Sequence, residues 1–155
     1  MIKSFGYAIR GLLLSLREER NLRIHFAASG WVIWLAWLAG TTPGERAALA
    51  VCCGLVICGE LFNTAVEATV DLLSPHYHQL ARRAKDVAAA GVLAGAFFAV
   101  VTGLLLFLPK AKLLVTIFAA FTLSDWLLTA AAAGISVCFV VFLPRLFPKY
   151  EGENS

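Results

Sequence analysis

Long apolar stretches alternate with short polar ones along this chain, and the pattern predicts helices that cross a membrane. A spanning helix needs about 20 mostly apolar residues, because each residue adds about 1.5 Å across a hydrocarbon core about 30 Å thick. Stretches of this kind recur along the sequence, separated by turns that contain glycine, proline or charged residues. The predicted spans are residues 24–40, 47–73, 87–108 and 126–143.

The segment 4–23 has a different pattern, in which apolar and charged side chains occupy different faces of one helix. Its apolar side chains recur at helical spacing: Phe5, Ile9, Leu12 and Leu16. Such a helix is typical of the membrane surface, where its cations contact anionic lipid headgroups. A soluble helix packed on a partner is the alternative, and the adjoining span favours the membrane surface.

These elements predict an all-α integral membrane protein with two parts. Residues 1–112 would form a membrane domain that consists of the surface helix and three transmembrane helices. Residues 113–155 would form a C-terminal extension that contains the additional span. Within this extension, the stretch from Leu113 to Leu123 is too short to span alone and would be either interfacial or part of a broken fourth helix. Ser124 and Asp125 suit a helix N-cap, and Pro144 would end that helix.

Composition supports a membrane protein. The chain of 155 residues is 60% hydrophobic and only 15% charged, whereas soluble domains are close to 25% charged. The net charge of +3 is modest and the cations are scattered, so we expect no nucleic-acid-binding surface. All the cysteines lie inside apolar stretches, as packing residues do, rather than in a polar disulfide framework.

Lysine and arginine predict the orientation of the chain in the inner (plasma) membrane. They are concentrated before the first span and between the second and third spans. Because cytoplasmic loops carry an excess of these cations, we expect a multi-pass protein whose N-terminus and 74–86 loop are cytoplasmic. A fourth span would return the chain to the cytoplasm.

Four polar residues on the second span predict a functional site. Glu60, Asn63, Glu67 and Asp71 recur at steps of three or four residues, which places them on one face of a helix near its cytoplasmic end. A carboxylate in hydrocarbon costs several kcal/mol unless it is paired, hydrated or bound to a metal. A polar seam between helices would explain Asn63, but it would not explain three aligned acids.

Aligned acids require a cation, and the neighbouring residues suggest a phosphate ligand. Magnesium usually binds one or two carboxylates together with substrate phosphates. The run Arg82-Arg83-Ala84-Lys85-Asp86 lies just beyond the acids, where its cations suit a polyphosphate. Ordinary anchoring of cations at the cytoplasmic face would explain this run equally well. The sequence contains no P-loop and no Gly-x-Gly-x-x-Gly motif, so a nucleotide would bind by an unusual scheme.

The polar residues resemble those of the prokaryotic diacylglycerol kinase and undecaprenol kinase family, over roughly residues 3 to 112. The shared motifs are Glu60-Leu-Phe-Asn63-Thr-Ala-Val-Glu67-Ala-Thr-Val-Asp71, Tyr77-His78, Arg83-Ala84-Lys85-Asp86, Gly6-Tyr7 and Glu19-Arg20-Asn21-Leu-Arg23-Ile-His25. The resemblance implies a surface helix and three spans, assembled as homotrimers with active sites between protomers. It also implies that ATP phosphorylates a lipid alcohol at the cytoplasmic face.

The resemblance assigns a role to each matching residue. Glu60 would be the general base that takes the proton of the lipid hydroxyl, with Asn63 supporting it and Asp71 in a supporting position. Glu19 and Glu67 would hold the Mg²⁺ that bridges the ATP phosphates. The residues implied to contact ATP are Tyr7, Glu19, Glu67, His76, Tyr77, His78, Lys85 and Asp86.

The identity of the lipid and the class of function leave alternatives. Undecaprenol and diacylglycerol both qualify as the alcohol, and the stretch from Glu19 to His25 looks more like the undecaprenol kinase branch. A small cation or proton transporter is an alternative of another class, because intramembrane acids also line ion pathways. That alternative predicts acids on several helices, whereas the interiors of the other spans contain none. A passive membrane subunit would leave the aligned acids unexplained.

Overall fold

The computed structural model describes residues 2–74, 76 and 78–146, and these residues form helices joined by short connections. The helices are α1 (Ile2–Glu18), α2 (Arg20–Leu38), α3 (Pro43–Leu73), α4 (Gln79–Phe107), α5 (Ala111–Ala119) and α6 (Leu123–Leu146). A 3-10 turn, η1 (Leu108–Lys110), joins α4 to α5. The predicted all-α class is confirmed.

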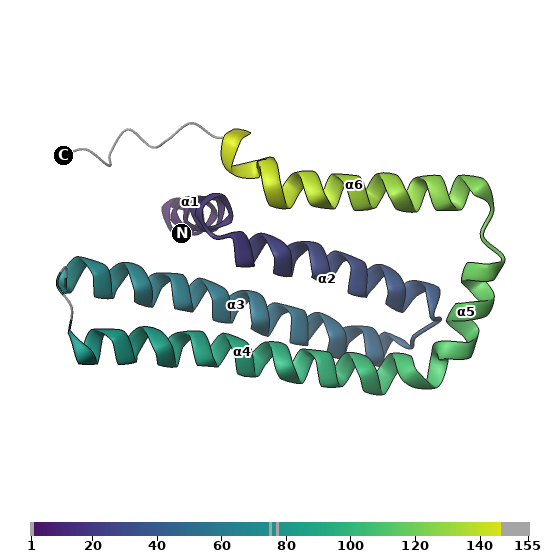
Figure 1. Cartoon of the computed structure of the whole chain (residues 1–155), viewed down its shortest axis with the longest axis horizontal. Coiled ribbons are helices and arrows are strands. Elements are labelled where there is room, and N and C mark those ends of the chain that lie inside the picture. Colours follow the sequence, from purple (N-terminus) through teal and green to yellow (C-terminus); the bar gives the residue numbers. More distant parts are fainter. Residues whose placement is uncertain (1, 75, 77, 147–155) are drawn as a thin grey trace.

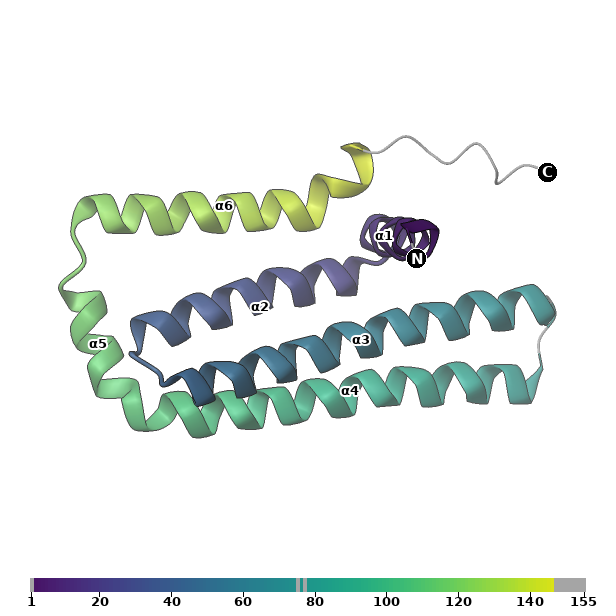
Figure 2. The ribbon, with the colours of Figure 1, turned by 180° about the vertical axis from the view of Figure 1, so that it is seen from behind.

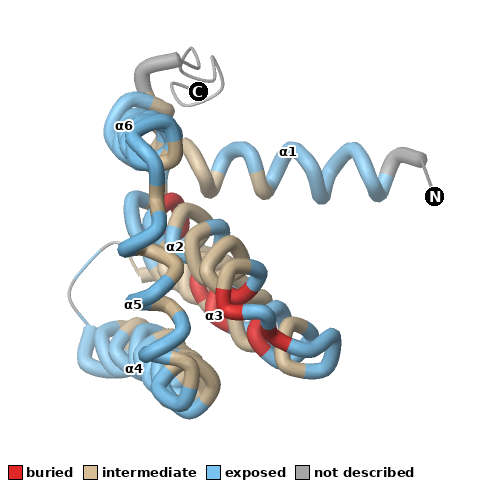
Figure 3. The backbone as a smooth tube through the Cα atoms, turned by 90° about the vertical axis from the view of Figure 1, so that its right-hand side faces the viewer, coloured by how far each residue is buried: buried red, intermediate tan, exposed pale blue. Residues whose placement is uncertain are grey.

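Four of the helices lie side by side along the long axis of the molecule, in the order α6, α2, α3, α4 (Figures 1 and 2). Helix α1 runs across this direction at one end (Figures 1 and 3), and α5 connects α4 to α6 at the other end. At the α5 end, an ion pair of 3.1 Å between Lys110 Nζ and Glu45 Oε1 ties η1 to the start of α3. The molecule therefore has two different ends, and α1 marks one of them.

Little of this structure is buried, as expected for helices that lipid surrounds. The buried apolar side chains belong to α2, the turn after it, and α3 (Figure 3): Leu22, Ala36, Ala39, Leu49 and Val56. Helix α4 has no buried residue. In the described part of the chain, three helical stretches are long and apolar enough to cross a membrane: Pro43–Leu73, Gln79–Ala119 and Leu123–Pro144. The prediction of a multi-pass membrane protein is therefore confirmed.

Helix α2 corresponds to the predicted span 24–40 and lies beside α3 and α6, although it does not meet the same requirement of length and apolarity. Polar residues in its first turn are the reason, because the helix begins at Arg20 and includes Asn21 and Arg23. The surface helix was predicted to include these residues, and that boundary is wrong. Helix α1 ends at Glu18, and Glu19 has an extended backbone (φ −93°, ψ 109°) that turns the chain into α2.

Capping residues account for the start of α3. Helix α3 begins at Pro43, four residues earlier than the predicted span, because Thr42 and Glu45 form a capping box. The Glu45 backbone N–H donates to Thr42 Oγ1, and the Thr42 N–H donates to Glu45 Oε2 at 2.6 Å. Pro43 occupies the first turn, where its missing N–H costs little.

The starts of α4 and α6 also differ from the sequence prediction. Helix α4 begins at Gln79, where the His78 side chain accepts a bond from the Leu80 N–H, so the cationic run lies on a helix and not in a loop. Helix α6 begins after Thr122, whose N–H donates to Asp125 Oδ2 at 2.9 Å. The predicted cap at Ser124 is therefore wrong by two residues. Pro144 lies inside α6 and does not end it.

Candidate active site

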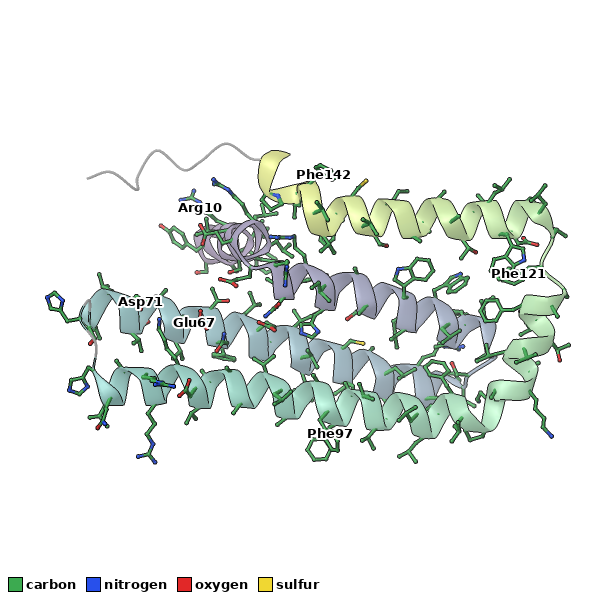
Figure 4. The ribbon with its side chains drawn as sticks, viewed as in Figure 1. Arg10, Glu67, Asp71, Phe97, Phe121 and Phe142 are labelled. Atoms are coloured by element: carbon green, nitrogen blue, oxygen red, sulfur yellow. The ribbon has the colours of Figure 1, made fainter. Side chains whose placement is uncertain are left out.

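Glu60, Asn63, Glu67 and Asp71 form a polar stripe along α3. Their helical spacing lets side chains of this stripe bond to one another. Asn63 Nδ2 donates to Glu67 Oε1 at 2.8 Å, one turn further along the helix. Asn63 Oδ1 is buried and has no hydrogen-bond partner within the described residues. In Figure 4, where α1 is seen end-on, Glu67 lies near α1 and Asp71 lies further along α3, towards the end of that helix. The stripe therefore runs from a buried position at Glu60 to an exposed one at Asp71.

A histidine from α2 faces the predicted general base. Glu60 is only 4% exposed, and its Oε1 lies 3.2 Å from His25 Nε2. This contact satisfies a carboxylate that would otherwise be costly to bury. Sequence reasoning assigned no role at the site to His25. The one available signal was its place at the end of the family-like stretch that begins at Glu19.

The turn between α1 and α2 brings Glu19 towards the acids of α3. Burial raises the pKa of Glu19, and the carboxylates of Glu67 and Glu60 raise it further, as does Glu18 to a smaller extent. Arg23 opposes this rise. Glu67, the other predicted metal ligand, therefore acts electrostatically on Glu19, and we call Glu19, Glu60 and Glu67 the acidic cluster.

The chemistry of this cluster fits a magnesium ion. Its donors are carboxylate oxygens whose mutual repulsion a cation would relieve. Among the residues described, no group of three histidine, cysteine or acidic side chains is arranged to hold a metal by itself. Glu19 and Glu67 would therefore supply two ligands, and phosphate oxygens would complete the coordination, as is usual for magnesium. Magnesium binding stays a prediction.

The far end of the stripe meets the start of α4 in a polar cavity of about 330 Å³. Lys85 Nζ lies 2.6 Å from Asp71 Oδ1, and this pair joins α4 to α3 in the wall of the cavity. An exposed pair, Arg82 Nε and Asp86 Oδ2 at 3.7 Å, lies on the first turns of α4. The predicted residues that line this cavity are Asp71, His76, His78, Lys85 and Asp86.

Three of the described residues that were predicted to contact ATP, Tyr7, Glu19 and Glu67, do not line this cavity. Tyr7 lies on α1, is 67% exposed and is absent from the described lining of the cavity. Tyr77 lies outside the described residues. Arg82, to which no individual role was assigned, does line the cavity, and its position in the cationic run was the signal for it.

An apolar groove of about 390 Å³ lies between α2, α3 and α4. Its walls consist mostly of small and aliphatic side chains, including Ala28, Val32, Cys53, Val56, Ala99 and Gly103. His25, which contacts Glu60, is one of its few polar lining residues. Glu60 is not among the described lining residues, and His25 is the residue that links the groove to Glu60.

The crowded carboxylates predict a stability gain from Glu19→Gln. Because the pKa of Glu19 is raised above its ordinary value of 4.5, the folded state binds the proton more tightly than the unfolded state. The free energy of unfolding therefore falls as the pH rises from about 4.5 through the raised pKa. We expect Glu19→Gln to have a higher thermal midpoint than the wild type at pH 7 in magnesium-free detergent, and an equal midpoint at pH 4.

Thermal unfolding followed by circular dichroism at both pH values would check this result. The exposed Glu18→Gln is the matched control and should raise the midpoint less, because Glu18 contributes less to the repulsion on Glu19. Equal midpoints for the wild type and Glu19→Gln at pH 7 would show that the carboxylates do not crowd each other.

Comparisons with known proteins identify the family of this chain. A family model described as prokaryotic diacylglycerol kinase matches residues 6–107. An undecaprenol kinase of Bacillus subtilis is 41% identical over 108 residues, which are 70% of this chain and 88% of that protein. A diacylglycerol kinase of Synechocystis is 42% identical over 110 residues, which are 70% of this chain and 63% of that protein. A diacylglycerol kinase of Escherichia coli K12 is 33% identical over 102 residues, which are 66% of this chain and 84% of that protein.

The matched residues include the whole of the candidate site. The acids of α3, the turn at Glu19 and the start of α4 all lie between residues 6 and 107, whereas η1, α5 and α6 follow the match. The resemblance that the polar motifs indicated is therefore confirmed over more than half of the chain. The chain belongs to the prokaryotic diacylglycerol kinase family, a family of lipid kinases.

Proposed function

We propose that this protein transfers the γ-phosphoryl group of ATP to the hydroxyl of a membrane lipid alcohol, with undecaprenol as the preferred alcohol. The observation that carries the proposal is the buried contact between Glu60 and His25, in which His25 lines an apolar groove. The helix that contains Glu60, α3, also contributes to the exposed polar cavity. A lipid kinase needs an apolar site and a polar site that meet at one reacting oxygen. The stripe on α3 connects these two sites.

The lipid chain would lie in the groove between α2, α3 and α4, which leaves its hydroxyl at Glu60. During the reaction, Glu60 accepts the hydroxyl proton while the lipid oxygen attacks the γ-phosphorus. The bond between the γ-phosphorus and the oxygen that bridges to the β-phosphate breaks, and ADP leaves. His25 holds the Glu60 carboxylate in place through their 3.2 Å contact.

The phosphates would lie between the acids of α3 and the start of α4. When bound, Mg²⁺ would neutralise charge on the phosphate oxygens, held by Glu19 and Glu67. Lys85 is fixed by Asp71 at 2.6 Å and presents its ammonium group towards the polar cavity. Positioning and charge neutralisation are the main requirements of phosphoryl transfer, so a site of this kind needs no glycine-rich loop.

The orientation and the assembly are also part of the proposal. Cations concentrate at the end of the molecule where α1 and the polar cavity lie, and the positive-inside rule makes that end cytoplasmic in the inner membrane. This orientation gives the site access to cellular ATP. Assembly as a homotrimer stays a prediction, and light scattering of the detergent-solubilised protein tests it.

The preference for undecaprenol rests on the stretch from Glu19 to His25. This stretch begins with Glu19, between α1 and α2, and continues through the first turns of α2 to His25, which contacts the proposed base Glu60. Similar proteins named for either substrate share nearly the same identity with this chain, and overall identity therefore does not distinguish the two alcohols.

The experiment that tests the proposal compares the two alcohols directly. Purified protein in mixed micelles receives γ-labelled ATP with either undecaprenol or a dioleoyl diacylglycerol, and labelled lipid is counted. We expect a higher kcat/KM with undecaprenol. Equal values would remove the substrate preference, and no labelled lipid with either alcohol would contradict the lipid kinase itself.

A cation or proton transporter is less consistent with the structure. The described acids of the candidate site extend from Glu60, near the middle of α3, to the end of α3, and none of them lies in the other half of that helix. ATP consumption that depends on the lipid alcohol and persists in detergent would separate the kinase from a transporter, because transport requires a sealed membrane.

A further inference from the structure

Helix α6 contains an acceptor that the helix cannot satisfy by itself. Pro144 lies inside α6, and proline has no backbone N–H. The carbonyl that this N–H would bind in a regular helix belongs to Val140, four residues earlier. An unpaired carbonyl away from water is costly, so the position calls for a donor from outside the helix.

Arg23 on α2 supplies this donor. Its Nε donates to the Val140 carbonyl at 2.8 Å, although the two residues are 117 positions apart. Its Nη1 donates to the carbonyls of Leu16 and Arg17, both at 2.8 Å. These two carbonyls belong to the last turn of α1, where helix carbonyls have no partner within their own helix.

A single guanidinium group therefore joins three helices at one point. Arg23 is 5% exposed, so these bonds are shielded from competing water. Only arginine offers several N–H donors in a fixed planar fork, whereas lysine has one flexible ammonium group. Trp31 Nε1, which donates to Ser136 Oγ at 3.2 Å, is a second link between α2 and α6.

Glu19 lies in the short segment between Arg23 and its two partners on α1, Leu16 and Arg17. The Glu19 N–H donates to the Ser15 carbonyl at 2.8 Å, and the Glu19 carbonyl accepts from the Arg23 N–H at 3.4 Å. Arg23 thus fixes both sides of the turn that directs Glu19 towards the acids of α3. The third partner of Arg23 comes from α6, which lies beyond the residues that match the family.

We infer that Arg23 is a positioning residue and that α6 acts through it as a brace, holding the turn at Glu19 in the geometry that binds the metal–nucleotide complex. This role rests on the proposed function of Glu19. It gives the C-terminal extension a task in the phosphoryl transfer, although α6 supplies no residue to the reacting atoms. The brace depends on Pro144, because that residue frees the carbonyl that Arg23 binds.

The test uses full-length Pro144→Ala, which restores an N–H at position 144 and lets α6 satisfy Val140 by itself. We expect amide hydrogen exchange across residues 16–24 to become about tenfold faster, the change that corresponds to loss of one charged hydrogen bond. We expect the Kd of a fluorescent ATP analogue with Mg²⁺, and the KM for MgATP, to rise several-fold. The KM for the lipid alcohol should stay unchanged.

The matched control is Ile135→Ala, because Ile135 lies on α6 with 71% of its surface exposed. It should change neither the exchange nor the nucleotide affinity. Arg23→Lys should act like Pro144→Ala, and the double variant should bind the ATP analogue little worse than Arg23→Lys alone, since both substitutions break the same link.

Additive effects of Arg23→Lys and Pro144→Ala, or unchanged exchange across residues 16–24 in Pro144→Ala, would overturn the brace. If Arg23→Lys does not fold, amide hydrogen exchange in Pro144→Ala alone tests the brace. The exchange measurement needs neither ATP nor lipid. It therefore separates a failure of the brace from a failure of the proposed kinase activity, which the wild-type assay would reveal.

Discussion

Glu60→Gln is expected to lower kcat for lipid phosphorylation by about 10²- to 10⁴-fold, the usual contribution of a general base. Glutamine has nearly the shape of glutamate and can keep a hydrogen bond to His25, but its amide cannot accept the hydroxyl proton. The KM values for MgATP and for the lipid should change little, because the substitution leaves both binding sites in place. Initial rates with labelled ATP in mixed micelles would measure the loss.

Glu18→Gln is the control for this substitution, since Glu18 is exposed and lies outside the contacts of Glu60. It should keep wild-type kcat. His25→Gln should give a smaller loss, about tenfold, because His25 positions the carboxylate and does not take the proton. A Glu60→Gln variant with wild-type kcat would show that another group is the base.

Glu67→Gln is expected to reduce the affinity for the magnesium–nucleotide complex by about 100-fold, because it removes one of two predicted carboxylate ligands. The glutamine oxygen can still accept the bond from Asn63 Nδ2, so α3 should keep its local structure. Binding of a fluorescent ATP analogue, titrated with Mg²⁺ in the absence of lipid, would give the change without reference to turnover.

The same titration with Glu18→Gln should match the wild type, as that carboxylate is not a predicted ligand. Unchanged magnesium dependence in Glu67→Gln would remove Glu67 from the metal site. A loss of nucleotide binding that excess Mg²⁺ partly restores would support its role as a ligand.

The sequence predicted those features that depend on local spacing. The apolar stretches predicted the class of fold and most of the long helices, and the steps between Glu60, Glu67 and Asp71 predicted their common face. The cationic run before the third span was also placed correctly next to Asp71, as the Lys85–Asp71 pair shows. Helical periodicity determines the helices and the common face, and the short connection between α3 and α4 brings the cationic run beside Asp71; both are visible in a single sequence.

Relations between different helices could not be predicted in this way. The contact of His25 with Glu60 depends on how α2 packs against α3, and no spacing along the chain reveals that packing. Arg23 was assigned to the surface helix because charge favours the headgroup region. In the structure it is buried, because carbonyls at two helix ends and at a proline provide enough acceptors for its guanidinium group.

Helix ends were the least accurate part of the prediction for a related reason. A stretch of apolar residues shows where lipid contacts a helix, but hydrogen-bonded caps determine where the helix starts. Helix α4 continues beyond its apolar stretch to His78, and α3 begins at the capping box of Thr42, in both cases further out than the hydrophobic pattern extends.

The direction of α6 has a consequence for what else this enzyme can be attached to. The residues that match the family stop near the end of α4, at the far end of the molecule from α1, whereas α6 runs back and reaches Leu146 beside α1. A chain that stopped at Phe107 would expose its C-terminus on the opposite side of the membrane. With α6 added, a soluble enzyme attached after Leu146 would share a compartment with the proposed nucleotide site, and such an enzyme could use the lipid phosphate that the proposed reaction makes.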